Sequence, residues 1–113
     1  MAEEHNPDYQ WKRLFLDDTR ACPQGFDLSR NATDCVEKLR SNEYDEIWLD
    51  YDLGDGLDGD HVAHEICALY RDGSIPRLKK VVVHSSNKKG SAHMMEDLKR
   101  MTGLEVVRNQ LAK

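Results

Sequence analysis

The chain has 113 residues, of which 39% are hydrophobic and 33% charged, and its formal net charge at pH 7 is −5. This length holds one domain of ordinary size and leaves no room for a second core. The apolar content is too high for a disordered chain, and the negative charge argues against broad binding to duplex DNA or to a membrane surface. A small phosphate ester or an RNA end stays compatible with it, because a bound cation can supply local positive charge.

The cysteines and the apolar runs indicate the compartment. Cys22, Cys35 and Cys67 are widely spaced and form no paired metal-binding motif, which favours reduced thiols. The apolar runs are too short to span a bilayer, and the acidic, polar beginning is unlike a signal peptide. We therefore expect a cytoplasmic protein, with a polar lead-in over residues 1–11 and one domain over residues 12–113.

The first part of the chain predicts a strand, a loop and a second strand. Residues 13–16 form a short apolar run that stops at Asp17 and Asp18, as a buried strand does where it meets a loop. Residues 19–25 contain a proline and a glycine, which excludes a regular helix there. A brief strand is expected at residues 26–29.

The middle of the chain predicts a helix and another buried strand. An apolar stripe predicts a helix over residues 32–41, with Asn31 or Thr33 as its cap. The apolar run at residues 46–49 also stops at an aspartate, Asp50. The Gly- and Asp-rich stretch that follows is expected to be a loop.

The last part continues the alternation of helices and strands. Apolar spacing predicts a helix over residues 61–70, a strand over 81–83, a helix that opens at Gly90 or Ser91, and a strand over 104–107. The strands are continuous apolar runs. Together with the alternation, this predicts a mostly parallel sheet of four or five strands, covered on both faces.

Two histidines on the helix over residues 61–70 resemble half of a metal site. His61 and His64 lie three residues apart, with Glu65 beside them. The same spacing suits a solvated helix face, and no third ligand is evident. We therefore interpret these histidines as solvated.

Polar side chains follow three of the predicted strands at the point where each strand ends: Asp17, Asp18, Asp50, Asp52, His84, Ser85 and Asn87. Because ligands bind outside the carboxyl ends of parallel strands, we expect these side chains to meet at one edge of the sheet. Carboxylates at short range repel one another, so such a cluster favours a cation. Hard oxygen ligands suit Mg²⁺ or Mn²⁺.

Other groups at the same edge suit a phosphate. Ser85, Asn87 and the backbone N–H groups that open the following helix are suitable donors to phosphate oxygens. His84 is able to move a proton near neutral pH, although a structural role in a neighbouring loop is an almost equal alternative. The sequence thus predicts a metal-dependent site for phosphate chemistry.

The order of these motifs resembles the response-regulator receiver domain. In that family the paired acids after the first strand bind magnesium, and the aspartate after the third strand accepts a phosphoryl group. The resemblance implies these roles for Asp17, Asp18 and Asp50, with Ser85 near the family's hydroxyl position. Receivers also carry a lysine after the fifth strand, where this chain has Arg108, and a long first helix, which is missing here.

A divergent group, the cyclic-phosphate processing receiver domains, is more similar. The similarity is carried by residues 16–20, 49–54 and 84–87, with Tyr51 at a position where the group usually has histidine. It implies a single receiver-like, flavodoxin-like α/β domain. Such a domain is a three-layer sandwich, here with the first helix shortened or replaced by a loop. It also implies a domain that hydrolyses or senses cyclic phosphates on nucleotides or RNA ends.

The leading hypothesis is therefore a phosphoesterase that opens a cyclic phosphate with Mg²⁺ or Mn²⁺. The residues assigned to it are Asp17, Asp18 and Asp50 for the metal, Asp50, Asp52 and His84 for catalysis, and Arg20, Ser85 and Asn87 for the phosphate. Two alternatives stay open. One is a signalling receiver that is phosphorylated on Asp50, and the other is a module that binds cyclic phosphates without turnover.

Overall fold

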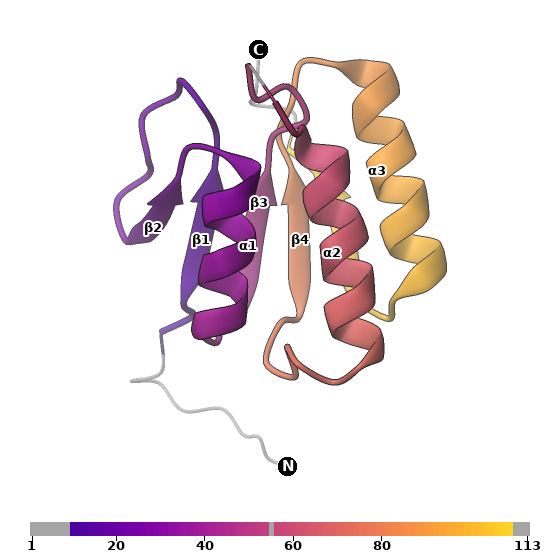
Figure 1. Ribbon diagram of the computed structural model, residues 1–113. Helices are drawn as coiled ribbons and strands as arrows, with labels where there is room; N and C mark the ends of the chain where they lie inside the picture. Colours follow the sequence, from indigo (N-terminus) through magenta and orange to yellow (C-terminus); the bar gives the residue numbers. More distant parts are fainter. Residues whose placement is uncertain (1–9, 55, 110–113) are drawn as a thin grey trace.

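The computed structural model describes residues 10–54 and 56–109. These residues form one parallel sheet of five strands, in the order β2-β1-β3-β4-β5, and three helices (Figure 1). The elements are β1 (Arg13–Leu16), β2 (Phe26–Ser29), α1 (Ala32–Ser41), β3 (Glu46–Leu49), α2 (Gly59–Arg71), β4 (Lys80–Val83), α3 (Lys88–Met101) and β5 (Glu105–Arg108). Residues 1–9 of the predicted lead-in and residues 110–113 lie outside the described part. None of the described helices is long and apolar enough to cross a membrane.

The strands follow the apolar runs of the sequence. β1, β2 and β3 have their predicted bounds, β4 begins one residue earlier than predicted, and β5 is displaced by one residue. All four neighbouring pairs of strands are parallel. The predicted class, a flavodoxin-like α/β fold with a loop in place of the first helix, is confirmed.

The helix starts depend on capping residues. α1 has its predicted bounds. α2 begins two residues earlier than predicted because the Asp58 side chain accepts hydrogen bonds from backbone N–H groups of its first turn. The prediction that α3 opens at Gly90 or Ser91 is wrong. The helix begins at Lys88 because the Asn87 side chain accepts a hydrogen bond from the Gly90 backbone N–H.

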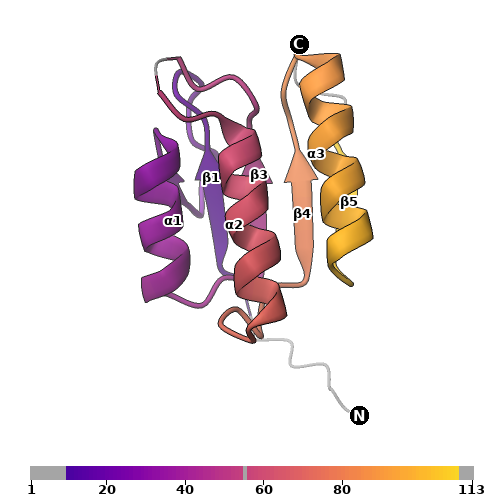
Figure 2. The ribbon, with the colours of Figure 1, turned by 45° about the vertical axis from the view of Figure 1, so that its right-hand side comes forward.

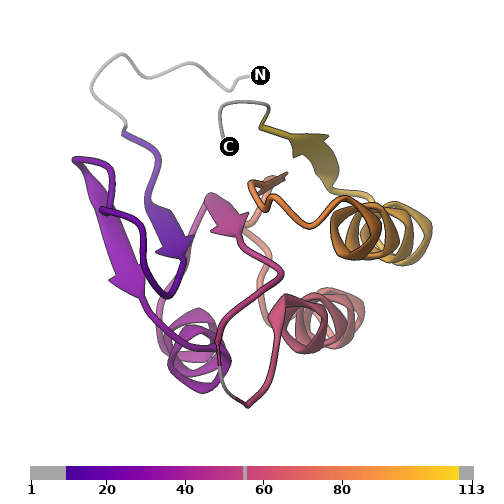
Figure 3. The same cartoon turned by 90° about the horizontal axis from the view of Figure 1, so that it is seen from above.

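All three described helices lie on one face of the sheet (Figures 2 and 3). That face carries alternate strand residues, all fully buried in the main core: Leu14, Leu16, Ile47, Leu49, Val81 and Val83. The opposite face carries no described helix, so the expectation of cover on both faces is not met within the described residues. There Phe26 packs edge-on against Phe15 and Trp48, with ring centroids 6.1 and 5.4 Å apart. Mutual packing of aromatic rings thus shields this face.

Candidate functional site

The ends of β1, β3 and β4 meet at one edge of the sheet, toward which their arrows point in Figure 1. Leu16, Leu49 and Val83 lie side by side in register, so the residues after them are neighbours. Two further hydrogen bonds extend the ladder past the strands, from the Asp50 N–H to the Leu16 carbonyl (3.2 Å) and from the His84 N–H to the Leu49 carbonyl (2.9 Å). The parallel register therefore brings the predicted polar residues together.

Asp17, Asp18 and Asp50 form a compact carboxylate cluster at this edge. Each offers an oxygen that lies within 4.8 Å of the other two. Asp17 is fully buried, Asp50 is nearly so, and Asp18 is half-buried. Gly54 lies against the cluster, with a φ of +78°, and a Cβ there would lie 3.1 Å from Asp18 Oδ2. A close set of carboxylate oxygens, with no side chain on the neighbouring Gly54 to crowd them, fits a hard divalent cation.

Asp17 is held as a carboxylate by several donors. Its Oδ1 accepts hydrogen bonds from the backbone N–H groups of Thr19 and Arg20, both at 2.9 Å, and its Oδ2 lies 3.1 Å from the Arg20 guanidinium. Burial raises the pKa of Asp17, but these donors and the nearby His84 outweigh burial, so the pKa lies below its ordinary value. Asp17 is therefore a fixed negative charge.

Asp50 is in the opposite electrostatic situation. Burial raises its pKa to about 6, and the neighbouring charge of Asp17 adds to the effect, while a hydrogen bond from the Ser85 hydroxyl opposes it. Without a cation, Asp50 thus ionises only as pH rises through about 6, above the range of an ordinary aspartate. A cation beside the three carboxylates would favour its ionised form and lower that pKa.

Arg20 and His84 both lie against the Asp17 carboxylate, at 3.1 and 3.5 Å from its Oδ2. Arg20 Nη1 donates to the His84 carbonyl at 2.9 Å, and the His84 ring stacks on Phe15 with centroids 4.7 Å apart. Nε2 of His84 lies 3.1 Å from the Leu16 carbonyl, and Nδ1 lies 3.5 Å from Arg20 Nη1. Burial lowers the pKa of His84. A neutral ring with the proton on Nε2 donates to the carbonyl and accepts from Arg20, so it satisfies both contacts.

The remaining predicted residues connect the cluster to α3. The Ser85 hydroxyl oxygen accepts a hydrogen bond from the Asn87 backbone N–H at 3.1 Å. The Asn87 amide donates to Asp52 Oδ1 at 3.3 Å while its oxygen caps α3. Gly90 in the first turn of α3 is closely packed, since a Cβ there would lie 2.6 Å from the Tyr51 ring. The positive end of the α3 dipole therefore lies beside Asp52 and beside Ser85, whose hydroxyl donates to Asp50.

Comparison with known families identifies the domain. Residues 12–100 match the family model of the cyclic-phosphate processing receiver domain. The chain belongs to this family. No curated protein matches the sequence.

Solved receiver domains share the fold of this family member. The response regulator receiver domain (CheY-like) from Methylobacillus flagellatus has a TM-score of 0.66 and 16% identity, over 90% of this chain and 87% of that one. A Burkholderia pseudomallei response regulator with a phosphorylated aspartic acid, a calcium ion and citrate has a TM-score of 0.61 and 14% identity. The match covers 92% of this chain and 62% of that one. The receiver domain of Francisella response regulator 1452 has a TM-score of 0.55 and 18% identity, over 88% and 84%.

This cyclic-phosphate processing receiver domain also has a positively charged side chain, Arg108, at the end of β5. Arg108 pairs in register with Val83, and its Nη2 donates to the Ser85 carbonyl at 3.0 Å. The sequence signal was present, because Arg108 stands where receivers carry lysine. The sequence shows the absence of that lysine but not the contact with Ser85, because the direction of a side chain cannot be taken from a short apolar run.

Proposed function

We propose that this domain binds a divalent cation through Asp17, Asp18 and Asp50 and uses the site to open a cyclic phosphate. The observation that carries the proposal is the carboxylate cluster at the strand ends beside the start of α3. Family membership supports a cyclic phosphate as the substrate class. Mg²⁺ or Mn²⁺ suits the all-oxygen ligand set and would offset negative charge on the phosphate.

Opening a cyclic phosphate diester consumes one water molecule. One P–O ester bond breaks, the released sugar oxygen gains a proton, and the phosphorus gains the water oxygen. The first turn of α3 and the side chains of Ser85 and Asn87 are suited to bind the phosphate oxygens. Asp52 is exposed and is oriented by the Asn87 amide, so it is the group proposed to position the attacking water and take its proton.

In this proposal Arg20 and His84 hold the Asp17 carboxylate in position. Arg20 uses Nη1 on Asp17 and on the His84 carbonyl, and its side chain is 35% exposed, so the rest of the guanidinium can approach a phosphate. His84 is 2% exposed and its ring nitrogens face protein atoms. The role proposed for it here is to hold Asp17 and Arg20 in position. Proton exchange between His84 and a substrate stays a prediction.

The test is turnover of nucleoside 2′,3′-cyclic phosphates and of RNA oligonucleotides that end in a cyclic phosphate. Ring opening with Mn²⁺ or Mg²⁺ that stops with EDTA and in Asp50→Asn supports the proposal. Glu37→Gln is the matched control, because it removes one exposed carboxylate on α1 and should keep full activity. Absence of turnover with every substrate, or equal turnover in Asp50→Asn, contradicts the catalytic proposal. Binding without turnover favours the non-catalytic module.

The second candidate is a receiver phosphorylated on Asp50, and one contact favours it. The Ser85 hydroxyl donates to the Asp50 carboxylate, and the Arg108 guanidinium donates to the backbone carbonyl of the same serine. Acid-labile labelling of Asp50 by acetyl phosphate in the presence of Mg²⁺ would support this candidate. Unlabelled protein under conditions that label a known receiver would exclude it.

A further inference from the structure

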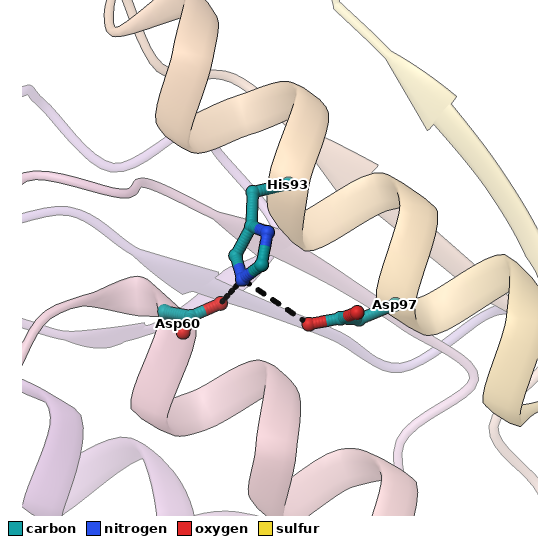
Figure 4. Close-up of side chains that lie close together, drawn as sticks. All are labelled: Asp60, His93 and Asp97. Carbon is teal, nitrogen blue, oxygen red and sulfur yellow. Dashed lines mark ion pairs between the residues drawn. The ribbon is translucent and has the colours of Figure 1, made fainter.

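A second group of metal-ligating side chains lies between α2 and α3, apart from the strand-end cluster. Asp60 is in the first turn of α2 and His64 lies one turn further along. His93 and Asp97 have the same spacing of four residues on α3. Figure 4 shows His93 between the two carboxylates, one from each helix. The packing of α2 against α3 thus brings together residues that are far apart in the sequence.

The separations between the histidine nitrogens and the carboxylate oxygens suit ligands of a shared metal ion better than direct hydrogen bonds. His93 Nε2 lies 3.4 Å from Asp97 Oδ2 and 3.8 Å from Asp60 Oδ1. His64 Nε2 lies 3.7 Å from Asp97 Oδ2 and 3.9 Å from Asp60 Oδ2. All four separations exceed ordinary hydrogen-bond lengths. Two ligands bound tetrahedrally to one Zn²⁺ at about 2.0–2.1 Å lie roughly 3.4 Å apart, so a small closure would bring the ligand atoms of Asp60, His93 and Asp97 to bonding distance.

The hydrogen bonding of the two carboxylates gives independent support. Asp60 Oδ1 is buried and has no hydrogen-bond partner among the described residues. Asp97 has a 13% exposed side chain, and its Oδ1 accepts a hydrogen bond from Arg100 at 2.9 Å, which leaves Oδ2 facing both histidines. A buried carboxylate oxygen without a donor is unfavourable, and a cation beside it removes that cost.

We propose that Asp60, His93 and Asp97, whose ligand atoms all lie within 4.8 Å of one another, bind a divalent transition-metal ion, with Zn²⁺ as the best match, and that this ion clamps α2 to α3. His64 lies beside this group and is a candidate for the fourth ligand position. Imidazole and carboxylate ligands together suit Zn²⁺, Co²⁺ or Ni²⁺, whereas the strand-end cluster offers only oxygen and suits Mg²⁺ or Mn²⁺. His61 is not part of the group. The competing explanation is a set of ordinary ion pairs between protonated histidines and the acids, which would need no metal.

The experiment titrates EDTA-treated, dialysed protein with Co²⁺ in saturating Mg²⁺, the ion that the proposed function assigns to the strand-end carboxylates. The proposal predicts a visible absorption band of tetrahedral cobalt that saturates at one ion per chain and is displaced by Zn²⁺. It also predicts a Zn²⁺-dependent rise in Tm. Absence of both the band and the rise overturns the proposal and leaves the ion-pair explanation.

Variants locate the ion. His93→Gln and Asp97→Asn should each weaken Co²⁺ affinity by more than about tenfold, because even outer partners of metal ligands have effects of that size. His61→Gln and Asp50→Asn are the controls that should keep the band. Retention of the band in His93→Gln, or its loss in Asp50→Asn alone, overturns the assignment. His64 and His93 are 63% and 58% exposed, so His64→Gln provides a second folded variant if another fails to fold.

Discussion

The ends of β1 and β3 each place an aspartate at the same edge of the sheet, yet the two surroundings differ. Asp17 follows β1 and receives two backbone N–H groups and the Arg20 guanidinium, which lower its pKa. Asp50 follows β3, and burial and the charge of Asp17 raise its pKa to about 6. The difference shows how one edge can hold both an aspartate that ionises readily and one whose ionised form is disfavoured until a cation lies beside it. It also predicts opposite responses to mutation.

The largest expected effect is loss of stability in Asp17→Asn. The substitution removes the charge that Arg20 and His84 face, and it places an amide NH₂ donor where Oδ2 accepts from the Arg20 guanidinium. We expect a loss of about 2–4 kcal/mol in the free energy of unfolding at pH 7. Chemical denaturation measures it, with Asp72→Asn at the exposed end of α2 as a control that should lose much less. An unchanged midpoint for Asp17→Asn would contradict the described network.

Asp50→Asn should have the opposite effect in metal-free protein. The folded-state pKa of about 6 exceeds the ordinary value of 3.8. Between these values the folded state binds more protons than the unfolded state, so this carboxyl's contribution to stability is present at low pH and is lost as pH rises through 6. A rise of the pKa from 3.8 to about 6 corresponds to up to about 3 kcal/mol.

The measurement is denaturation of wild type and Asp50→Asn, both with EDTA, from pH 4 to pH 8. The variant should gain stability over wild type as pH rises and should gain almost nothing at pH 4. A difference that is independent of pH, or a variant that is less stable at pH 8, would contradict the raised pKa.

A smaller effect is expected at the start of α3. Asn87→Ala removes the cap of the helix and the contact with Asp52, so the free energy of unfolding should fall by about 1 kcal/mol. Asn87→Ser keeps a capping oxygen and should recover most of the loss. Thermal denaturation of both variants checks this, and equal loss in the two would show that capping is not the cause.

The smallest expected effect concerns Arg108. Its hydrogen bond to the Ser85 carbonyl is partly exposed, so Arg108→Ala should lose about 0.5 kcal/mol of stability. If the Arg108 guanidinium assists phosphorylation of Asp50, labelling of Asp50 by acetyl phosphate should fall strongly in Arg108→Ala even though the variant stays folded. Equal labelling in Arg108→Ala and wild type would separate this contact from that chemistry.

The sequence predicts the strands of the sheet, and which aspartates meet at its edge, for a physical reason. Short apolar runs that stop at acids define both the strands and the edge where parallel strands end. β1 and β3 therefore match their predicted bounds, and Asp17, Asp18 and Asp50 meet as expected.

The features that the sequence did not predict depend on which way side chains point. The sequence leaves open whether His84 exchanges protons with a substrate or has a structural role; in the structure the alternation of the strand continues for one residue and turns its ring onto Phe15 on the aromatic face. Cover on both faces was expected because a continuous apolar run does not reveal whether aromatic rings shield one face by themselves. The contact of His64 and His93 with the same carboxylate depends on how α2 packs on α3.

The most direct measurement is binding of Mn²⁺ to wild type, Asp50→Asn and Glu37→Gln, followed by the electron paramagnetic resonance signal of free Mn²⁺. We predict one ion bound per wild-type chain and competition by Mg²⁺. Binding should weaken as pH falls below about 6, should be unchanged in Glu37→Gln and should be lost in Asp50→Asn. Equal binding by Asp50→Asn and wild type, or no binding by wild type at pH 8, would contradict a cation site formed by Asp17, Asp18 and Asp50.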